Sequence, residues 1–130
     1  MNKKFHMIIL LFLVLAMACK QNPTESSKDA ADVEEQFRVE GELPSGTVVQ
    51  GWIKDAAIDL AQRLDVEVSD VTYIAFDVPV WPDASYGCPQ PGQEYEAVIK
   101  EGYQIELRVN GRNYFYHGGE DIAQFLCEDE

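Results

Sequence analysis

Apolar and polar residues alternate at helical spacing between Trp52 and Leu64, within a folded unit that starts near Thr47. The apolar residues that fall at this spacing are Trp52, Ile53, Ala56, Ala57, Leu60, Ala61 and Leu64. Apolar side chains three and four residues apart gather on one side of an α-helix. The pattern therefore predicts one amphipathic helix that ends near Leu64 and packs on the remainder of the domain.

The chain after residue 70 is rich in β-branched and aromatic residues, which favour β-strands. Pro79 interrupts the first of these segments, and proline is confined to strand ends and sheet edges because it donates no hydrogen bond. The predicted strands are 71–81, 95–99, 102–109 and 112–117. We expect the last residues to form one short helix over Ile122, Phe125 and Leu126.

Asn110 and Gly111 predict a tight hairpin, because both central positions of a type I′ turn require a positive φ. This turn would pair Leu107 with Tyr114 and Ile105 with Tyr116, on the face that we assign to the core together with Tyr103. The opposite, solvated face would carry Gln104, Glu106, Arg108, Asn113, Phe115 and His117. The fold class is therefore α+β, with one helix on an antiparallel meander of about four strands over residues 47–130.

Residues 1–18 have the order of an export signal, with a basic start, an apolar run and small residues before Cys19. Two processing routes remain open at Cys19. In bacterial lipoproteins such a cysteine receives fatty acids, palmitate among them, and becomes the new N-terminus, although Ala16 here replaces the usual leucine. Ordinary secretion would instead leave a free thiol. We expect the lipid anchor, which holds the protein on the outer side of the cell membrane or at the outer membrane.

Residues 19–46 are polar and predict a flexible tether, on which Phe37 and Val39 are the residues expected to dock on the domain. Once the signal is removed, the chain has 8 basic and 23 acidic residues and a net charge of −15. Such an acidic protein repels nucleic acid and anionic lipid head groups. Its partners are therefore expected to be the membrane, through the N-terminal lipid, and an envelope or extracellular protein.

Three cysteines are an odd number for an exported protein. If Cys19 carries lipid, Cys88 and Cys127 remain as a pair in a compartment that permits disulfides. A bridge between them would hold the C-terminal residues on the loop that contains Cys88. We therefore predict a Cys88–Cys127 disulfide.

Residues 82–93 contain three prolines and two glycines and predict a constrained loop. Two interpretations remain open for this region. The loop could close the fold, with Trp81 and Tyr86 covering the end of the sheet, or it could present a rigid aromatic surface for recognition. The candidate binding residues are Trp81, Pro82, Asp83, Ser85, Tyr86, Pro89, Pro91 and Tyr95.

Catalytic chemistry has little support in the sequence. His117 is the one histidine beyond the signal, and no cluster of histidines and cysteines has metal-ligand spacing. Cys88 with His117 is the one nucleophilic pair to consider, and a disulfide at Cys88 would remove it. We expect no metal, no cofactor and no enzymatic activity.

The loop and its surroundings carry a run of residues with a specific spacing. This run reads Trp81-Pro82-Asp83, Ser85, Gly87-Cys88-Pro89, Pro91-Gly92, Tyr95, Gly102-Tyr103 and Tyr114, Tyr116-His117. Over about residues 55 to 127 it resembles a family of small exported bacterial proteins of unknown function, in which leucine usually stands at the position of Tyr86. The resemblance implies export and fold but no activity. A looser likeness to PepSY-like and cystatin-like domains, which include peptidase inhibitors, concerns the fold alone.

The sequence thus favours a surface-tethered binding module, such as a peptidase inhibitor or a modulator of an envelope protein. A structural or stress-related envelope lipoprotein without a specific ligand is the second hypothesis. A cysteine-dependent enzyme is the third.

Overall fold

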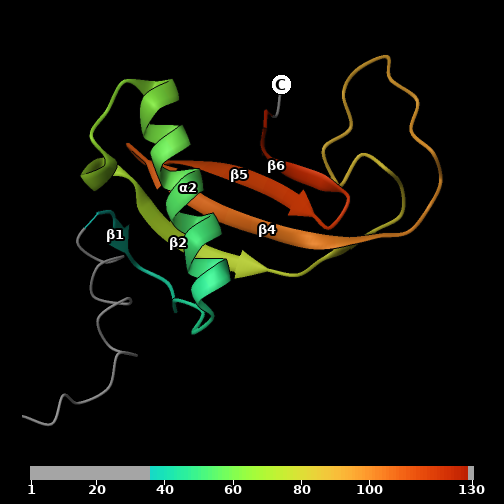
Figure 1. The fold of residues 1–130 in the computed structure, drawn as a ribbon. Coiled ribbons are helices and arrows are strands. Elements are labelled where there is room, and N and C mark those ends of the chain that lie inside the picture. The colour runs from blue at the N-terminus through green and yellow to red at the C-terminus, as the bar shows by residue number, and fades with distance from the viewer. Residues whose placement is uncertain (1–35, 129–130) are drawn as a thin grey trace, which may run out of the picture.

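The computed structural model describes residues 36–128, which form one helix on a mixed sheet (Figure 1). The predictions for the export signal, Cys19 and most of the tether concern residues outside this range. The elements in chain order are β1 (Arg38–Val39), α2 (Thr47–Leu64), the 3-10 helix η2 (Val68–Asp70), β2 (Thr72–Asp77), β3 (Val80–Trp81), β4 (Lys100–Val109), β5 (Arg112–Gly119) and β6 (Ile122–Cys127). None of the helices in this range is long and apolar enough to cross a membrane.

The predicted helix is confirmed as α2, which begins at Thr47 and ends at Leu64. It terminates where Asp65 adopts a left-handed conformation with φ of 54°, and the backbone N–H of Asp65 bonds the carbonyl of Gln62. Five of the seven predicted apolar positions are buried, and these are Ile53, Ala56, Ala57, Leu60 and Ala61. Trp52 and Leu64 are half-buried against the same core. Burial of this face against the sheet supplies the main core of the domain.

The sheet has more strands than the sequence predicted. Its order is β1-β2-β4-β5-β6, and β3 pairs with β4 beside β2. β1 runs parallel to β2, while the other pairs are antiparallel, so the sheet is mixed rather than a simple meander. The fold class α+β holds, and the strand count of about four was too low.

Two secondary-structure predictions were wrong. The C-terminal segment is strand β6 and not a helix, because its backbone pairs with the edge of β5, with Leu126 opposite Tyr116. Residues 95–99 form no strand. Two backbone amides around them, those of Ala84 and Val98, bond the carbonyl of Glu96 within the connection itself. In both cases the available backbone partner decided the conformation, and side-chain pattern did not.

The hairpin prediction is confirmed, since Leu107 pairs with Tyr114 and Ile105 with Tyr116. Asn110 and Gly111 have φ values of 51° and 81°, as the turn requires. Tyr103, Ile105 and Leu107 are buried beneath α2. The alternation of β4 therefore determines which face of the sheet receives the helix.

β2 and β3 share one register with β4, although a break separates them. Asp77 lies opposite Gln104 and Val80 opposite Glu101, so each step along one strand matches one step along the other. The break coincides with Pro79, whose carbonyl still accepts a hydrogen bond from the Gly102 amide at 3.4 Å. The two strands therefore act as one strand that continues beyond the first turn of α2.

The start of the described chain belongs to the folded domain. Phe37 is buried in the main core, and β1 pairs Arg38 with Thr72 and Val39 with Tyr73. The expectation that Phe37 and Val39 dock on the domain is confirmed. The folded domain accordingly begins before Thr47, within the segment expected to be tether.

Candidate functional site

The loop after β3 is anchored by aromatic side chains on the sheet face opposite α2. The Trp81 ring stacks on the His117 ring with centroids 5.3 Å apart, and Tyr86 meets the edge of Trp81 at 5.6 Å. Phe125 from β6 meets His117 at 6.0 Å. These side chains form a second, smaller core, so the opposite face is not fully solvated as the sequence suggested.

His117 is the main departure from that expectation. It lies opposite Gln104, as predicted, but it is only 5% exposed. Its Nδ1 lies 2.6 Å from the backbone carbonyl oxygen of Tyr86, which can only accept a hydrogen bond, so Nδ1 carries the proton. His117 thus links the loop to β5, which supports a structural role for this side chain.

Local turns shape the first half of the loop. The Asp83 carboxylate accepts a hydrogen bond from the Ser85 amide at 2.9 Å. Hydrogen bonding from the Ser85 side chain, together with this amide, holds the pKa of Asp83 below its ordinary value. The Cys88 amide then bonds the Ser85 carbonyl at 3.1 Å. Gly87 has a φ of 73°, and a Cβ there would lie 2.1 Å from the Trp81 ring nitrogen. Only glycine fits this position, which explains the Gly-Cys step of the motif.

The second half of the loop folds on itself through Tyr95. The Tyr95 hydroxyl accepts a hydrogen bond from the Gln90 amide at 3.0 Å and donates one to the Gln93 side chain at 3.2 Å. Tyr95 is half-buried as a result. It therefore organises the proline-rich tip rather than projecting from it.

The Cys88–Cys127 disulfide is confirmed. It joins the loop to the last residue of β6, and both cysteines are buried. Because the Cys88 sulfur is bonded to Cys127, this structure offers no thiolate for the Cys88–His117 pair. Within residues 36–128, no three histidine, cysteine or acidic side chains gather as metal ligands do.

The burial of the loop residues divides the eight candidate binding positions into two groups. Trp81, Ser85 and Tyr86 are buried, so their side chains close the fold and cannot form the aromatic recognition surface proposed for them. Pro82, Pro89 and Pro91 are exposed, while Asp83 and Tyr95 are intermediate. The loop surface available to a partner therefore consists of its prolines and the residues around them.

An exposed apolar edge lies beside this loop, and sequence reasoning missed it. Val78, Val80 and Ile99 are 71%, 62% and 76% exposed, and only Val48 joins them among the exposed large hydrophobic residues of the described chain. Val80 lies opposite Glu101 in the β3–β4 pair, and Ile99 falls on the same face by strand alternation. The apolar residues on both sides of Pro79 were the available signal, but they predicted only a strand that ends at Pro79 or lies at a sheet edge. We call Val78, Val80 and Ile99 the apolar edge.

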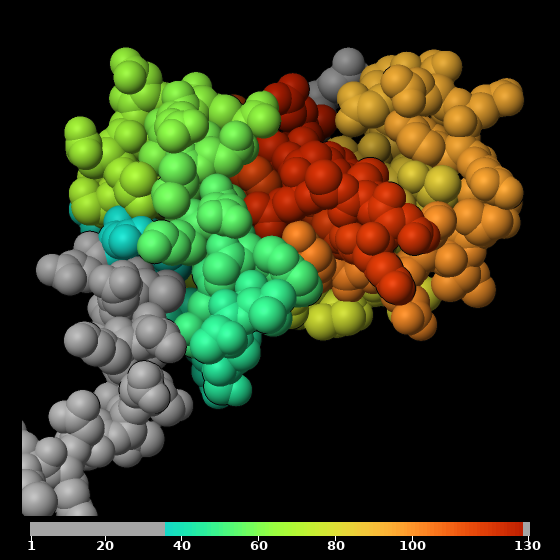
Figure 2. Space-filling model, in the orientation of Figure 1, coloured from blue at the N-terminus to red at the C-terminus, as the bar shows by residue number. Residues whose placement is uncertain are grey.

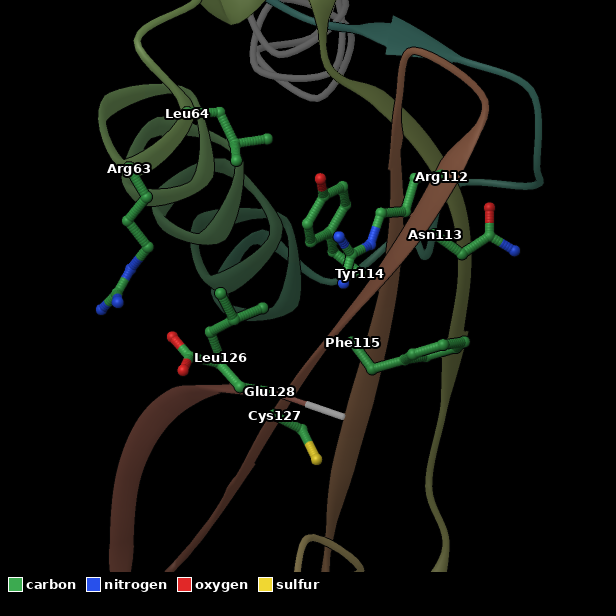
Figure 3. A pocket seen from close by; sticks show the side chains of 9 residues that line it. All are labelled: Arg63, Leu64, Arg112, Asn113, Tyr114, Phe115, Leu126, Cys127 and Glu128. Carbon is green, nitrogen blue, oxygen red and sulfur yellow. The ribbon is translucent and has the colours of Figure 1, made fainter. Parts of the chain in front are cut away.

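A hollow of about 490 Å³ opens between the C-terminal end of α2 and the ends of β5 and β6 (Figure 3). It is lined by Arg63, Leu64, Arg112, Asn113, Tyr114, Phe115, Leu126, Cys127 and Glu128. Both arginines already have partners, since Arg63 bonds Asp59 at 2.6 Å and Arg112 lies over the Tyr114 ring. The hollow also borders Glu128, the last described residue, and we assign no ligand to it.

A partly buried hydrogen bond joins α2 to the sheet near this hollow. The Tyr116 hydroxyl donates to the Asp59 carboxylate at 2.6 Å, and burial together with this bond raises the pKa of Tyr116 well above its ordinary value. Burial acts to raise the pKa of Asp59 as well, but the hydrogen bonds from Tyr116 and Arg63 outweigh it and leave that pKa lowered. Because the hydroxyl and the carboxylate are hydrogen-bonded to each other, we assign the pair a structural role.

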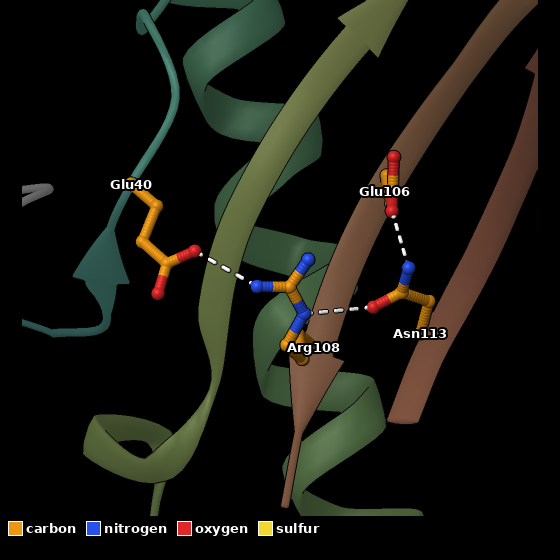
Figure 4. Close-up of polar contacts among 4 residues, drawn as sticks. All are labelled: Glu40, Glu106, Arg108 and Asn113. Atoms are coloured by element: carbon orange, nitrogen blue, oxygen red, sulfur yellow. Dashed lines mark hydrogen bonds and ion pairs between the residues drawn. The ribbon is translucent and has the colours of Figure 1, made fainter. Parts of the chain in front are cut away.

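The remainder of the opposite face is polar, as predicted. Arg108 bonds the Glu40 carboxylate at 2.9 Å and the Asn113 side chain at 2.8 Å, and Asn113 donates to Glu106 at 2.7 Å (Figure 4). These contacts join the residue after β1 to β4 and β5. They are mostly exposed to solvent, so each contributes little stability.

A family model described as a domain of unknown function (DUF8738) matches residues 53–127. The match covers α2 from Ile53 onward, the loop, both cysteines of the disulfide and strands β2 to β6. Neither the curated proteins nor the solved structures include a match.

Proposed function

The chain belongs to the DUF8738 family, a domain of unknown function, and we propose that it is a non-enzymatic binding module displayed on the bacterial cell envelope. The observation that carries the proposal is the position of the apolar edge. Three of the four exposed large hydrophobic side chains in the described chain gather at one end of the sheet. Exposed apolar side chains that cluster, rather than scatter, are typical of interaction sites.

The neighbouring loop supports this proposal because it is held rigidly. The disulfide, the His117–Tyr86 contact and the buried Trp81 fix its base. The exposed prolines at its surface restrict the backbone further. A surface that is ordered before binding loses little conformational entropy when a partner docks.

Display on the envelope rests on the sequence. The export signal, Cys19 and the polar segment that follows form the anchor and tether in this proposal. Anchoring through fatty acids would leave the folded domain facing the extracytoplasmic space. There it could meet a peptidase or another envelope protein and modulate it.

The absence of a catalytic role is part of the proposal. Cys88 is engaged in the disulfide, and His117 is packed between Trp81 and Phe125. Tyr116 and Asp59 satisfy each other. Each of these groups therefore has a structural explanation.

Capture from an envelope extract tests the proposal, with the full chain as bait and Val80→Lys as the variant. Val48→Lys is the matched control, because Val48 is an equally exposed valine on α2. We expect a discrete set of proteins that Val80→Lys loses and Val48→Lys retains. Identical capture by all three proteins would refute the apolar edge as the recognition surface.

A structural envelope protein without a specific ligand is the second candidate, and the burial of Trp81 and Tyr86 favours it. On this hypothesis the loop serves only to close the opposite face of the sheet. Substitutions at the apolar edge would then leave every interaction unchanged. Substitutions at Trp81 would lower stability alone.

A further inference from the structure

We infer that the apolar edge binds an extended, cationic segment of a partner protein, which adds as a strand alongside β2 and β3. The inference rests on the proposed function and specifies both the partner's chemistry and the geometry of binding. Three independent features carry it: an uncovered sheet face, an unpaired strand edge, and carboxylates around both.

The uncovered face is a continuation of the core surface. Phe76 stacks beside Tyr103 at 5.8 Å, and Trp52 of α2 stacks on Tyr103 at 4.4 Å. Because β2 and β3 share one register, Val78 and Val80 follow Phe76 on the same face of the sheet. Figure 2 shows the yellow β2–β3 segment reaching the surface beside the first turns of α2. The helix therefore covers only part of an apolar row that continues past it.

The strand edge beside this row has no partner strand within residues 36–128. β1 pairs only with Thr72 and Tyr73, and the chain at Gly41 passes against the carbonyl of Ile74. From Ala75 onward, the side of β2 and β3 that faces away from β4 is unpaired in the described chain. An unpaired edge of this kind is a template for strand addition.

Pro79 does not block this edge. Its carbonyl faces β4, where it accepts the Gly102 hydrogen bond, and its nitrogen faces the same way. The backbone groups of Val78 and Val80 consequently point outward, because successive residues of a strand alternate in direction. The missing donor of proline thus falls on the paired side, and the outward donors are intact.

The acidic charge of the domain indicates that the partner segment is cationic. Residues 36–128 contain 6 basic and 16 acidic side chains, a net charge of −10. Asp77 and Glu101 are both exposed beside the valines. Asp77 lies on the sheet face away from α2, whereas Glu101 lies opposite Val80 on the face of the apolar edge. Asp55 of α2 is near enough to Tyr103 to contribute, after burial, to the raised pKa of that tyrosine. Lys100 lies on the face away from α2, opposite Trp81, and its ammonium group bonds Asp121 at 3.1 Å.

A partner segment that alternates apolar and basic residues satisfies all three features. Its backbone would bond the outward groups of Val78 and Val80. Its apolar side chains would cover the apolar edge, and its basic side chains would lie on the opposite face beside Asp77. A second copy of this chain fits poorly, because the same carboxylates would oppose one another across the new pair.

A short capped peptide that alternates lysine and valine is the probe, and fluorescence anisotropy with the full chain is the measurement. We expect this peptide to bind and a valine–glutamate peptide to bind about tenfold more weakly or worse, since like charges repel. N-methylation of alternate amides along one edge of the lysine–valine peptide should weaken binding by a similar factor. That modification removes backbone donors and leaves side chains and charge unchanged.

Two pairs of variants make the test specific. Val80→Lys should weaken binding about tenfold while Val48→Lys does not, and Asp77→Lys should weaken it more than Glu120→Lys. Glu120 is the matched control because it is exposed in the turn between β5 and β6. Circular dichroism of each variant verifies that the fold is retained.

The inference is overturned if the N-methylated peptide binds as well as its parent, or if the valine–glutamate peptide binds as well as the lysine–valine one. It is also overturned if sedimentation shows that wild type self-associates through this edge and Val80→Lys does not. Loss of envelope capture by Val80→Lys together with any of these results would leave the proposed function standing and remove only strand addition.

Discussion

The disulfide is the contact whose removal tests the architecture most directly. Cys88 and Cys127 are 39 residues apart in sequence, and their bond joins the loop to the end of β6. Replacing both by alanine removes the bond and leaves no thiol at either position. In the chain-entropy account, a cross-link over about 40 residues restricts the unfolded state by about 4 kcal/mol.

The folded structure suggests that most of this value should be lost. Ile122, Phe125 and Leu126 of β6 are only partly buried, so the strand has limited apolar contact of its own. Trp81, Tyr86 and the main core beneath α2 remain in place, so the domain should still fold. We expect the double variant to lose about 2–4 kcal/mol of unfolding free energy, which lowers Tm by roughly 10–30 °C for a domain of this size.

Calorimetry and urea denaturation measure the loss, with wild type reduced by dithiothreitol as a second comparison. Reduced wild type and the double variant should unfold at similar temperatures, because both lack the cross-link. Limited proteolysis should cut within residues 82–99 sooner in both. A double variant whose Tm stays within a few degrees of wild type would show that the loop and β6 are held by packing alone.

Four further predictions concern substitutions elsewhere in the chain. Gly118→Ala should destabilise the domain by about 1–3 kcal/mol, because the added Cβ would lie 2.4 Å from the Tyr103 ring. Gly51→Ala in α2 is the control, because its Cβ would meet no atom within 4 Å, and it should stabilise the helix by about 0.5–1 kcal/mol. Urea denaturation measures both changes. Tyr116→Phe should cost about 1–2 kcal/mol by removing the bond to Asp59. The lowered pKa of Asp59 adds stability that is complete above the ordinary carboxyl pKa and disappears as the pH falls through the folded-state value, so Asp59→Asn should flatten the acid limb of a stability–pH profile. Cys19→Ser should abolish labelling by radioactive fatty acid and move the protein from the membrane to the soluble fraction; an unchanged membrane fraction would refute the anchor.

Local sequence signals predicted the elements whose conformation depends on near neighbours. The helical spacing up to Leu64 and the turn at Asn110 and Gly111 each depend on interactions a few residues apart. The hairpin turn in addition determined the pairing of Leu107 with Tyr114, because a tight turn sets the register of both strands. The Cys88–Cys127 bond was predicted by counting cysteines in an exported chain, which is a chemical constraint and not a conformational one.

Elements that depend on distant backbone were predicted incorrectly. Ile122–Cys127 is a strand because the free edge of β5 offers hydrogen bonds, and no pattern within the segment reveals that edge. Residues 95–99 lack a neighbouring strand, so the same kind of side chains remain in a loop there.

The candidate site likewise combines features that the sequence predicted with features that depend on distant parts of the chain. The Trp-Pro-Asp to Pro-Gly run revealed a rigid, specific loop, but it could not show which side chains face inward. Trp81 and Tyr86 are buried because β5 places His117 beneath them. Val78 and Val80 are exposed because α2 does not extend over them. By itself, the sequence determined the helix, the hairpin register and the cross-link, since these follow from local spacing and chemistry. Only the tertiary structure decided which apolar residues remain uncovered, because burial depends on how far each element extends over the sheet.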